Sequence, residues 1–277
     1  MIRLHLGLAT LATLAMLASC SLDPFMFNST ALDHYTLSDS VIPEKQREHV
    51  KLVVDGVTIH GFFVKQVDSL HGDPSYTIVY HQGNKDHLQY YWPRVELFYK
   101  AGFNVFVYDY NGFGMSGGTS TEASLYANAR AAWDYVFRRA DVDTTHITNY
   151  GYSLGGAAAV HVSTQHRMPH ALILEASFAS SESLVQSGTV LNIPGSYLMD
   201  GAFANDAKIG MNTAPLLIIH GTEDLFIPID RNGRVLFDLA RNPKTFRAVQ
   251  GAGHENIPVV MGEQNYIDLI TAFIKGS

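Results

Sequence analysis

The sequence GYSLGG, at residues 151–156, places a serine among closely spaced glycines. An extended run at 146–150 precedes it, and the small residues Ala157–Val160 that follow suit a helix. A nucleophile elbow of the G-x-S-x-G kind needs this strand–turn–helix context, because its serine adopts an unfavourable backbone conformation that projects the hydroxyl into a cleft. Side chains two positions before and after the serine would collide across the turn, and both positions are glycine here. The pattern predicts Ser153 as a nucleophile; the alternative is a glycine-rich turn without chemistry.

An acidic turn follows further along the chain. The apolar run Ala214–His220 is typical of a buried parallel strand. It leads into Gly221-Thr222-Glu223-Asp224, which presents two carboxylates just beyond the carboxyl end of that strand. The Gly-x-x-Asp spacing favours Asp224 over its rival Glu223. Taken alone, either residue is more simply interpreted as an ordinary turn acid.

A histidine completes the set. Another predicted strand at 245–249 is followed by Gly251-Ala252-Gly253-His254. We expect His254 to take the Ser153 proton and later give it to the leaving group, while Asp224 holds the imidazole in the required tautomer. A lone loop histidine would carry little weight, but serine, acid and histidine occur here in one order.

That order, with several motifs, resembles the α/β-hydrolases. From roughly Val53 to Ile274 the chain is similar to small-lid serine hydrolases whose oxyanion loop reads His-Gly-Asn. The fold implied is α/β: a doubly wound, mainly parallel sheet with a short lid insertion. The motifs that carry the resemblance, besides the elbow, are Tyr80–Asn84, Asp109–Ser116, Gly221–Asp224 and Gly253-His254.

The resemblance also implies an oxyanion hole. Its donors would be the backbone N–H groups of Leu154, at a helix N-terminus, and of Asn84. The chain departs from the family at two supporting positions. Gln82 stands where a histidine usually precedes the oxyanion glycine, with His81 one position earlier, and Asn111 stands where the family's Asp-Tyr-Arg-Gly motif has arginine.

Alternating strand and helix patterns predict one large domain, residues 45–277. Asp55-Gly56 marks a hairpin within His49–Gln66. Ligands of such a sheet bind beyond the carboxyl ends of its strands, where the motifs above fall. The remaining expected elements are strands at Tyr76–Tyr80, Asn104–Tyr108 and Ala171–Glu175, and helices at Leu88–Lys100 and Thr121–Arg139.

The lid is expected at about residues 180–213, where the strand–helix rhythm breaks. Its apolar residues could form an acyl pocket, or could simply pack the lid onto the domain. They are Leu184, Val185, Val190, Leu191, Ile193, Tyr197, Leu198 and Met199.

The amino terminus has the form of a secretion signal. A short basic start precedes a charge-free apolar run, Leu4–Ala18, which is too short for a comfortable membrane span. Leu17-Ala18-Ser19-Cys20 resembles a bacterial lipobox, which implies a signal peptide over 1–19, lipidation of Cys20 and a tether over 20–44. By resemblance to enterobacterial lipoprotein sorting, Ser21 after the cysteine favours the outer membrane of a bacterial envelope. The alternatives are an ordinary signal peptide with an incidental cysteine, or an uncleaved anchor. A chain beginning near Val41 is expected to keep its activity.

Composition excludes several function classes. The net charge is −7 without a basic cluster, so we expect no nucleic-acid partner. Among 13 histidines there is no His-Glu-x-x-His pair, and no dinucleotide fingerprint or phosphate loop occurs, so we expect neither a metal nor a cofactor.

The sequence therefore predicts an envelope-anchored serine hydrolase that cleaves a small carboxylic ester, or a related acyl substrate, through an acyl-enzyme. One alternative is an amidase or aminopeptidase, which would need lid acids (Glu182, Asp200 or Asp206) to hold a substrate ammonium group. The other is a catalytically silent envelope binding protein with the same fold.

Overall fold

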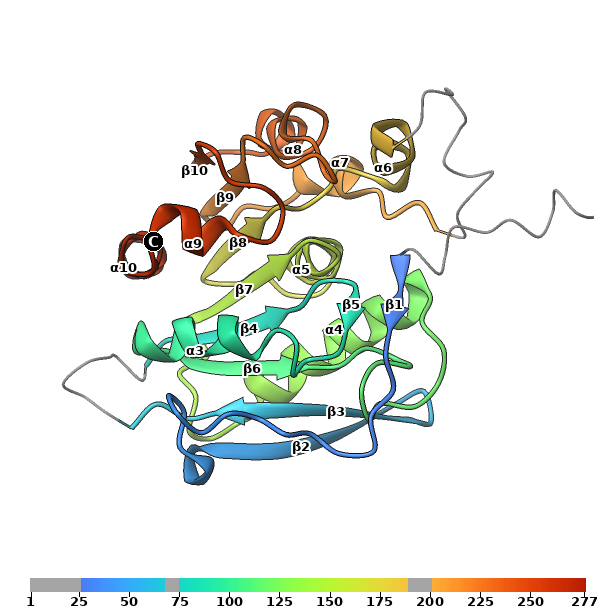
Figure 1. Cartoon of the computed structure of the whole chain (residues 1–277), viewed down its shortest axis with the longest axis vertical. Coiled ribbons are helices and arrows are strands. Elements are labelled where there is room, and N and C mark those ends of the chain that lie inside the picture. Colours follow the sequence, from blue (N-terminus) through green and yellow to red (C-terminus); the bar gives the residue numbers. More distant parts are fainter. Residues whose placement is uncertain (1–25, 68–74, 189–200) are drawn as a thin grey trace, which may run out of the picture.

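An eight-stranded sheet runs through the computed structural model of this chain, which describes residues 26–67, 75–188 and 201–277 (Figure 1). Its strand order is β10-β9-β8-β7-β4-β6-β3-β2. All neighbours are parallel except β2 with β3 and β3 with β6. The strands are β2 (Arg47–Val54), β3 (Val57–Val64), β4 (Thr77–His81), β6 (Asn104–Tyr108), β7 (Ile147–Tyr152), β8 (Ala171–Glu175), β9 (Leu216–Gly221) and β10 (Lys244–Val249).

Helices cover both faces of the sheet, and every residue of β4, β6, β7, β8 and β9 is buried. One core joins the sheet to α3 and α10 through Phe98 and Ile270, and a second joins it to α4 and α5 through Trp133 and Ala158. A third packs Leu216 of β9 with Leu236 of α8. The predicted doubly wound, mainly parallel sheet is confirmed. The helices are α3 (Trp92–Lys100), α4 (Glu122–Phe137), α5 (Gly155–Gln165), α6 (Ser181–Gly188), α7 (Asn205–Ile209), α8 (Gly233–Leu239), α9 (Ile257–Met261) and α10 (Glu263–Lys275), with short 3₁₀ turns η1 (Glu44–Gln46) and η3 (Ile229–Arg231).

Local sequence signals explain several of these elements. Asp55 and Gly56 have φ angles of 50° and 80°, as a tight hairpin turn between β2 and β3 requires. The Thr121 side chain accepts a hydrogen bond from the Ser124 N–H and so caps α4 at the position where the sequence predicted a helix start. The sequence analysis assigned neither α8 nor α10, although α10 closes one core.

The amino-terminal segment differs from the expected tether. Strand β1 (Asn28–Ser29) pairs in parallel with β5 (Lys85–Asp86), and Ile42 is fully buried against the core. Met26 is also buried, against the opposite core. The segment therefore buries apolar side chains in the domain and pairs its backbone with β5. The folded domain thus begins before residue 45.

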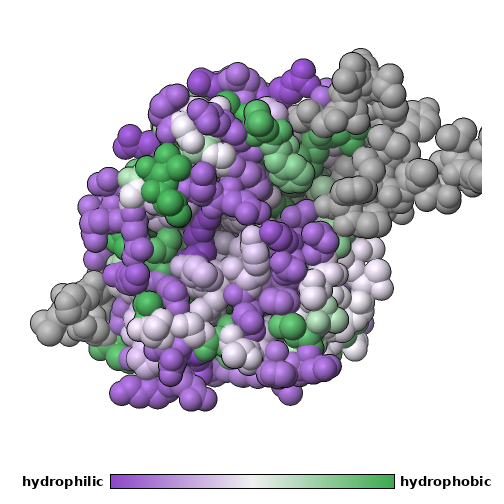
Figure 2. All heavy atoms as spheres, in the orientation of Figure 1, coloured by the Kyte–Doolittle hydropathy of each residue, from purple (hydrophilic) through white to green (hydrophobic). Residues whose placement is uncertain are grey.

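Two helices bound the expected lid, α6 and α7. Val185 is buried, and Leu184 packs beside it against the core under α4 and α5, so for these two residues the packing interpretation holds. The other apolar lid residues, from Val190 to Met199, lie outside the described residues. Figure 2 shows mostly polar residues on the visible described surface, with apolar groups in separate patches. Among the described helices, none is long and apolar enough to cross a membrane.

Candidate active site

Ser153 sits in the turn between β7 and α5, with a φ angle of +52°. This left-handed conformation is unfavourable for a residue with a Cβ and costs on the order of 1–3 kcal/mol. A hydrogen bond of 2.9 Å from the Ser153 N–H to the Glu175 carbonyl, at the end of β8, helps to hold it. The strained elbow predicted from the sequence is therefore present.

The glycines of the elbow are required because neighbouring atoms leave no room for a Cβ. A Cβ on Gly151 would lie 2.5 Å from the Gly155 carbonyl oxygen, and a Cβ on Gly155 would lie 1.9 Å from that of His81. A Cβ on Gly156 would lie 2.2 Å from Ser177 Oγ. The amino-terminal turn of α5 thus packs directly on the end of β4 and on the segment after β8.

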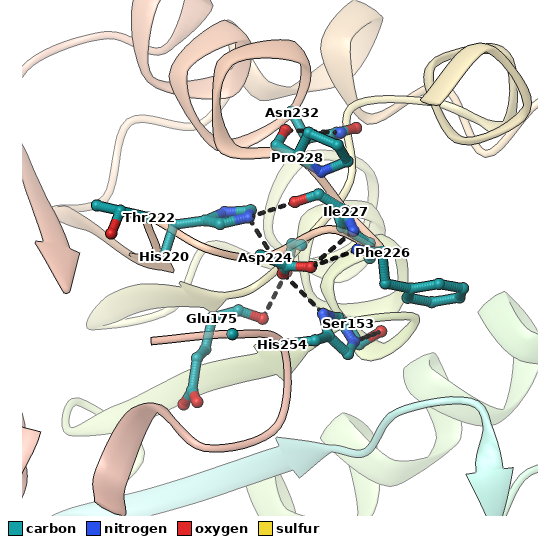
Figure 3. A network of polar contacts seen from close by, with 12 residues as sticks. Ser153, Glu175, His220, Thr222, Asp224, Phe226, Ile227, Pro228, Asn232 and His254 are labelled. Carbon is teal, nitrogen blue, oxygen red and sulfur yellow. Dashed lines mark hydrogen bonds and ion pairs between the residues drawn. The ribbon is translucent and has the colours of Figure 1, made fainter. Parts of the chain in front are cut away.

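The structure brings Ser153, His254 and Asp224 together (Figure 3). His254 Nε2 lies 3.0 Å from Ser153 Oγ, and His254 Nδ1 lies 2.8 Å from Asp224 Oδ2. An ionised carboxylate only accepts, so Nδ1 carries the hydrogen and Nε2 is left to accept from the serine hydroxyl. This arrangement can take a proton from Ser153 and stabilise the resulting imidazolium.

Asp224 is buried and fixed by several donors. Its Oδ1 accepts hydrogen bonds from the backbone N–H groups of Phe226 and Ile227, at 3.0 and 2.7 Å. Burial acts to raise the pKa of the carboxyl, but the hydrogen bonds from His220 and His254 outweigh it and hold that pKa well below its usual value. The rival Glu223 is exposed, so the structure supports the choice of Asp224 as the residue that contacts His254.

His220 is a component that the sequence analysis missed. This fully buried residue at the end of β9 has its Nε2 2.7 Å from the Ile227 carbonyl and 3.4 Å from Asp224 Oδ2. A carbonyl only accepts, so Nε2 carries the hydrogen and also points it toward the carboxylate. Gly233 leaves room for the ring, because a Cβ there would lie 2.5 Å from His220 Nδ1. The available signal was a histidine four residues before Asp224 at the end of an otherwise apolar strand.

The two candidate oxyanion donors are Leu154, directly after the serine, and Asn84, in the loop after β4. Leu154 begins the turn that leads into α5, and within the described part of the chain its N–H donates to no backbone carbonyl. Asn84 follows β4 and lines the same pocket as Ser153 and His254. Asn84 thus lines the serine's pocket and Leu154 follows the serine in the chain, while their role as oxyanion donors stays a prediction.

The loop that carries Asn84 is held by Gln82. The Gln82 side-chain N–H donates to Asp109 Oδ1 at 2.8 Å, and the Gln82 backbone carbonyl accepts from the Tyr110 hydroxyl at 2.7 Å. Burial raises the pKa of Asp109 to about 7, although hydrogen bonds from Tyr35, Gln82 and the Leu88 N–H oppose this. Gln82 thus ties the loop to the motif that begins at Asp109.

The other departures from the family pattern also have structural partners. His81 points into the core, where its ring contacts the Tyr108 hydroxyl and the Asn149 side chain, and burial lowers its pKa to about 4. The imidazole is therefore neutral near pH 7. The Asn111 backbone N–H donates to Asn128 Oδ1 at 3.0 Å, so this turn is fixed through its main chain.

A pocket of about 500 Å³ opens beside Ser153 and His254. Tyr91, Tyr152 and Phe226 give it aromatic walls, and Asn28 of β1 also lines it. In the described ranges, no group of three or more histidine, cysteine, aspartate and glutamate side chains could hold a metal ion.

The chain is similar in sequence and in fold to known proteins. The family described as serine aminopeptidase S33 matches residues 72–195, which include the elbow. The uncharacterized protein YfhR of Escherichia coli O157:H7 is 32% identical over 204 residues, 72% of this chain and 70% of that protein. Human alpha/beta hydrolase domain-containing protein 17B is 32% identical over 205 residues, 72% of this chain and 66% of that protein. The structure of the Pyrococcus furiosus esterase Pf2001 superposes with a TM-score of 0.72 at 14% identity, over 91% of this chain and 98% of that one.

The elbow packing yields a stability prediction. Gly155→Ala should lower the free energy of unfolding by about 3 kcal/mol or more, because its Cβ meets a backbone carbonyl that cannot rotate away. Gly117→Ala is the matched control, since its Cβ would lie 3.5 Å from Val57 Cγ1, an ordinary contact. Urea unfolding of both proteins measures the difference. Equal free energies for the two variants would contradict the close packing.

Proposed function

We propose that this chain, which belongs to the α/β-hydrolase superfamily and is a serine hydrolase of that type, cleaves carboxylic esters through an acyl-enzyme on Ser153. The observation that carries the proposal is the continuous contact from Ser153 Oγ through His254 to Asp224 at the wall of the pocket. Nucleophile, base and orienting acid are within hydrogen-bond reach of one another, which is the geometric requirement for this chemistry.

In the proposed reaction Ser153 Oγ attacks the ester carbonyl carbon while His254 Nε2 takes the hydroxyl proton. The intermediate collapses when His254 returns this proton to the leaving alcohol oxygen, and the acyl group stays on Ser153. Water then attacks the acyl carbon with His254 as base, the acid is released, and the serine recovers its proton. The Leu154 and Asn84 N–H groups would stabilise the oxyanion in both halves, and loss of one such donor typically costs 10²–10³-fold in turnover.

Esters are favoured over amides by the charges at the pocket. The family match carries the description serine aminopeptidase, and such an activity needs a free carboxylate to bind the substrate ammonium group. Glu182 and Asp206 line a different depression, and Asp200 lies outside the described residues. Glu255 does line the pocket, but it forms an ion pair with Lys85 at 3.8 Å and is therefore not a free carboxylate. The structural neighbour is described as an esterase, which also supports ester cleavage.

The catalytically silent alternative is less well supported. A protein that kept only the fold would have no need to retain a serine with a strained φ angle of +52°, or a buried acid held by two backbone N–H groups and a histidine ring. Such strain is retained where it has a use, so the site favours an enzyme.

We also propose that the protein is anchored to the bacterial outer membrane through lipidated Cys20. Support comes from the charge-free run that ends in Leu17-Ala18-Ser19-Cys20 and from Cys20 being the only cysteine in the chain. Residues 1–25 lie outside the described part of the structure, so this proposal rests on the sequence.

The nucleophile is tested by Ser153→Ala. The variant should fold normally and lose both fluorophosphonate labelling and hydrolysis of p-nitrophenyl butyrate, with turnover falling by about 10³-fold or more. Labelling is followed on gels, and hydrolysis on a panel of esters of graded chain length. Retained labelling of the folded variant would exclude Ser153, and an unlabelled, inactive wild-type protein would favour the silent alternative.

The acid is tested by a matched pair of amides. Asp224→Asn should preserve the fold and lower turnover by up to about 10⁴-fold, because the amide no longer selects the required tautomer of His254. Glu223→Gln removes an exposed carboxylate that does not contact His254 and should change turnover little. Steady-state kinetics of the two variants measure the loss of turnover. A larger loss in Glu223→Gln than in Asp224→Asn would assign the orienting acid to Glu223.

The anchor is tested by Cys20→Ala. In a bacterial host the wild-type protein should incorporate labelled palmitate and the variant should not, because no second cysteine is present. Acyl incorporation is the measurement to use, since an unprocessed variant could remain membrane-bound through Leu4–Ala18. Equal labelling of the two proteins would refute lipidation at this residue.

A further inference from the structure

The segment before residue 36 contacts the chain just after Asn84 directly, and is connected to the chain just before Asn84 through the Asp109 carboxylate. We call residues 26–35 the N-terminal strap. We propose that the strap is a structural part of the active site and that Tyr35 is a positioning residue for the oxyanion loop. This inference rests on the proposed function, because it assigns a catalytic consequence to the position of Asn84.

The strap holds the chain immediately after Asn84. Residues Asn28 and Ser29 of β1 pair with Lys85 and Asp86 of β5. The next strap residue, Thr30, donates its N–H to the Asp86 carbonyl and its hydroxyl to Asp86 Oδ1, both at 2.9 Å. The carboxyl side of the loop is thereby fixed by main-chain pairing with the strap.

The strap also holds the chain immediately before Asn84, through a buried carboxylate. The Tyr35 hydroxyl donates to Asp109 Oδ2 at 2.6 Å. The other oxygen of Asp109 accepts from the Gln82 side chain at 2.8 Å. Asp109 has no exposed surface, so its two oxygens depend on protein donors, and loss of one donor leaves a buried acceptor unsatisfied.

The Tyr35–Asp109 contact is accommodated by the backbone around it. Gly114 has a φ angle of +52°, and a Cβ there would lie 2.0 Å from Asp109 Oδ2 and 2.9 Å from the Tyr35 hydroxyl. The same hydroxyl accepts a hydrogen bond from the Met115 N–H at 3.2 Å. Strap backbone pairs with Gly114 in both directions, through Thr30 and Leu32.

The strap reaches the pocket itself. Asn28 lines the same pocket as Asn84, Ser153 and His254. A residue outside the expected domain thus contributes to the wall against which a substrate would bind. Because oxyanion donors act only when they lie within hydrogen-bond distance of the developing charge, a small shift of Asn84 should affect turnover more than substrate binding.

The test is Tyr35→Phe, which removes the hydroxyl and keeps the ring contact with Phe62 (5.4 Å between centroids). For p-nitrophenyl butyrate we expect kcat to fall about tenfold with KM changed less than twofold, a smaller loss than the 10²–10³-fold for deletion of a whole oxyanion donor. Tyr135→Phe is the matched control, because that hydroxyl donates to Glu48 Oε1 at 3.0 Å on edge strand β2. Its kcat should equal that of the wild-type protein.

Hydrogen exchange of the backbone amides in residues 82–88 gives a readout that does not depend on catalysis. Exchange should be faster in Tyr35→Phe than in wild-type or Tyr135→Phe protein. An unchanged kcat in Tyr35→Phe, or unchanged exchange in this loop, would overturn the inference while wild-type hydrolysis upholds the proposed function. If wild-type protein hydrolyses no ester and takes no fluorophosphonate, the proposed function fails, and the exchange result alone then decides whether the strap holds the loop.

Discussion

The close approach of the α5 amino terminus to the ends of β4 and β8 is the constraint on which the site depends. The position of a Gly155 Cβ would be 1.9 Å from the His81 carbonyl oxygen and 2.6 Å from that of Gln82. The elbow and the loop that leads to Asn84 are therefore in backbone contact, and neither can move alone. The same contact sets Ser153 in its left-handed conformation and places the Leu154 N–H at the start of a helix, where developing negative charge is stabilised.

A buried polar cluster around Glu175 contacts the backbone of the elbow. The Glu175 carbonyl accepts from the Ser153 N–H, while its carboxylate accepts from Arg94, Tyr150 and Tyr266. The Arg94 guanidinium lies 4.9 Å from the centre of the Tyr152 ring, whose hydroxyl donates to the His254 carbonyl at 3.2 Å. A buried charge is stable only when it is paired and hydrogen-bonded, as here. The cluster thus links the backbone of the nucleophile to the loop of the histidine.

The parts of the site that the sequence predicted are short motifs at the carboxyl ends of buried strands. The glycines around Ser153 indicate a tight turn, because larger side chains would collide there. Asp224 and His254 each follow a predicted strand within a few residues. The parallel sheet was predictable for the same reason, since the runs 104–108, 171–175 and 214–220 are mostly apolar and are separated by helical or loop segments. Topology then brings the ends of such strands to one edge of the sheet.

What the sequence could not predict depends on contacts between distant residues. Tyr35 reaches Asp109 across 74 positions, and nothing local marks it as different from any tyrosine in a polar segment. His220 belongs to an apolar strand, and its role follows from the bend that brings Ile227 and Asp224 back over it. A tether over residues 20–44 was expected from the lipobox resemblance. The pairing of Asn28 and Ser29 was missed because strand pairing uses backbone groups, which composition does not report.

The two proposals about the amino terminus meet at the strap. Asn28 lines the pocket and lies eight positions after Cys20, a stretch that spans at most about 28 Å when fully extended. Lipidation of Cys20 would therefore hold the pocket within about that distance of the membrane surface. The same connection means that a chain beginning near Val41, expected from the sequence to stay active, would lose both the β1–β5 pairing and the Tyr35–Asp109 contact. The strap that supports the oxyanion loop would thus also lie directly after the stretch that joins Cys20 to the pocket.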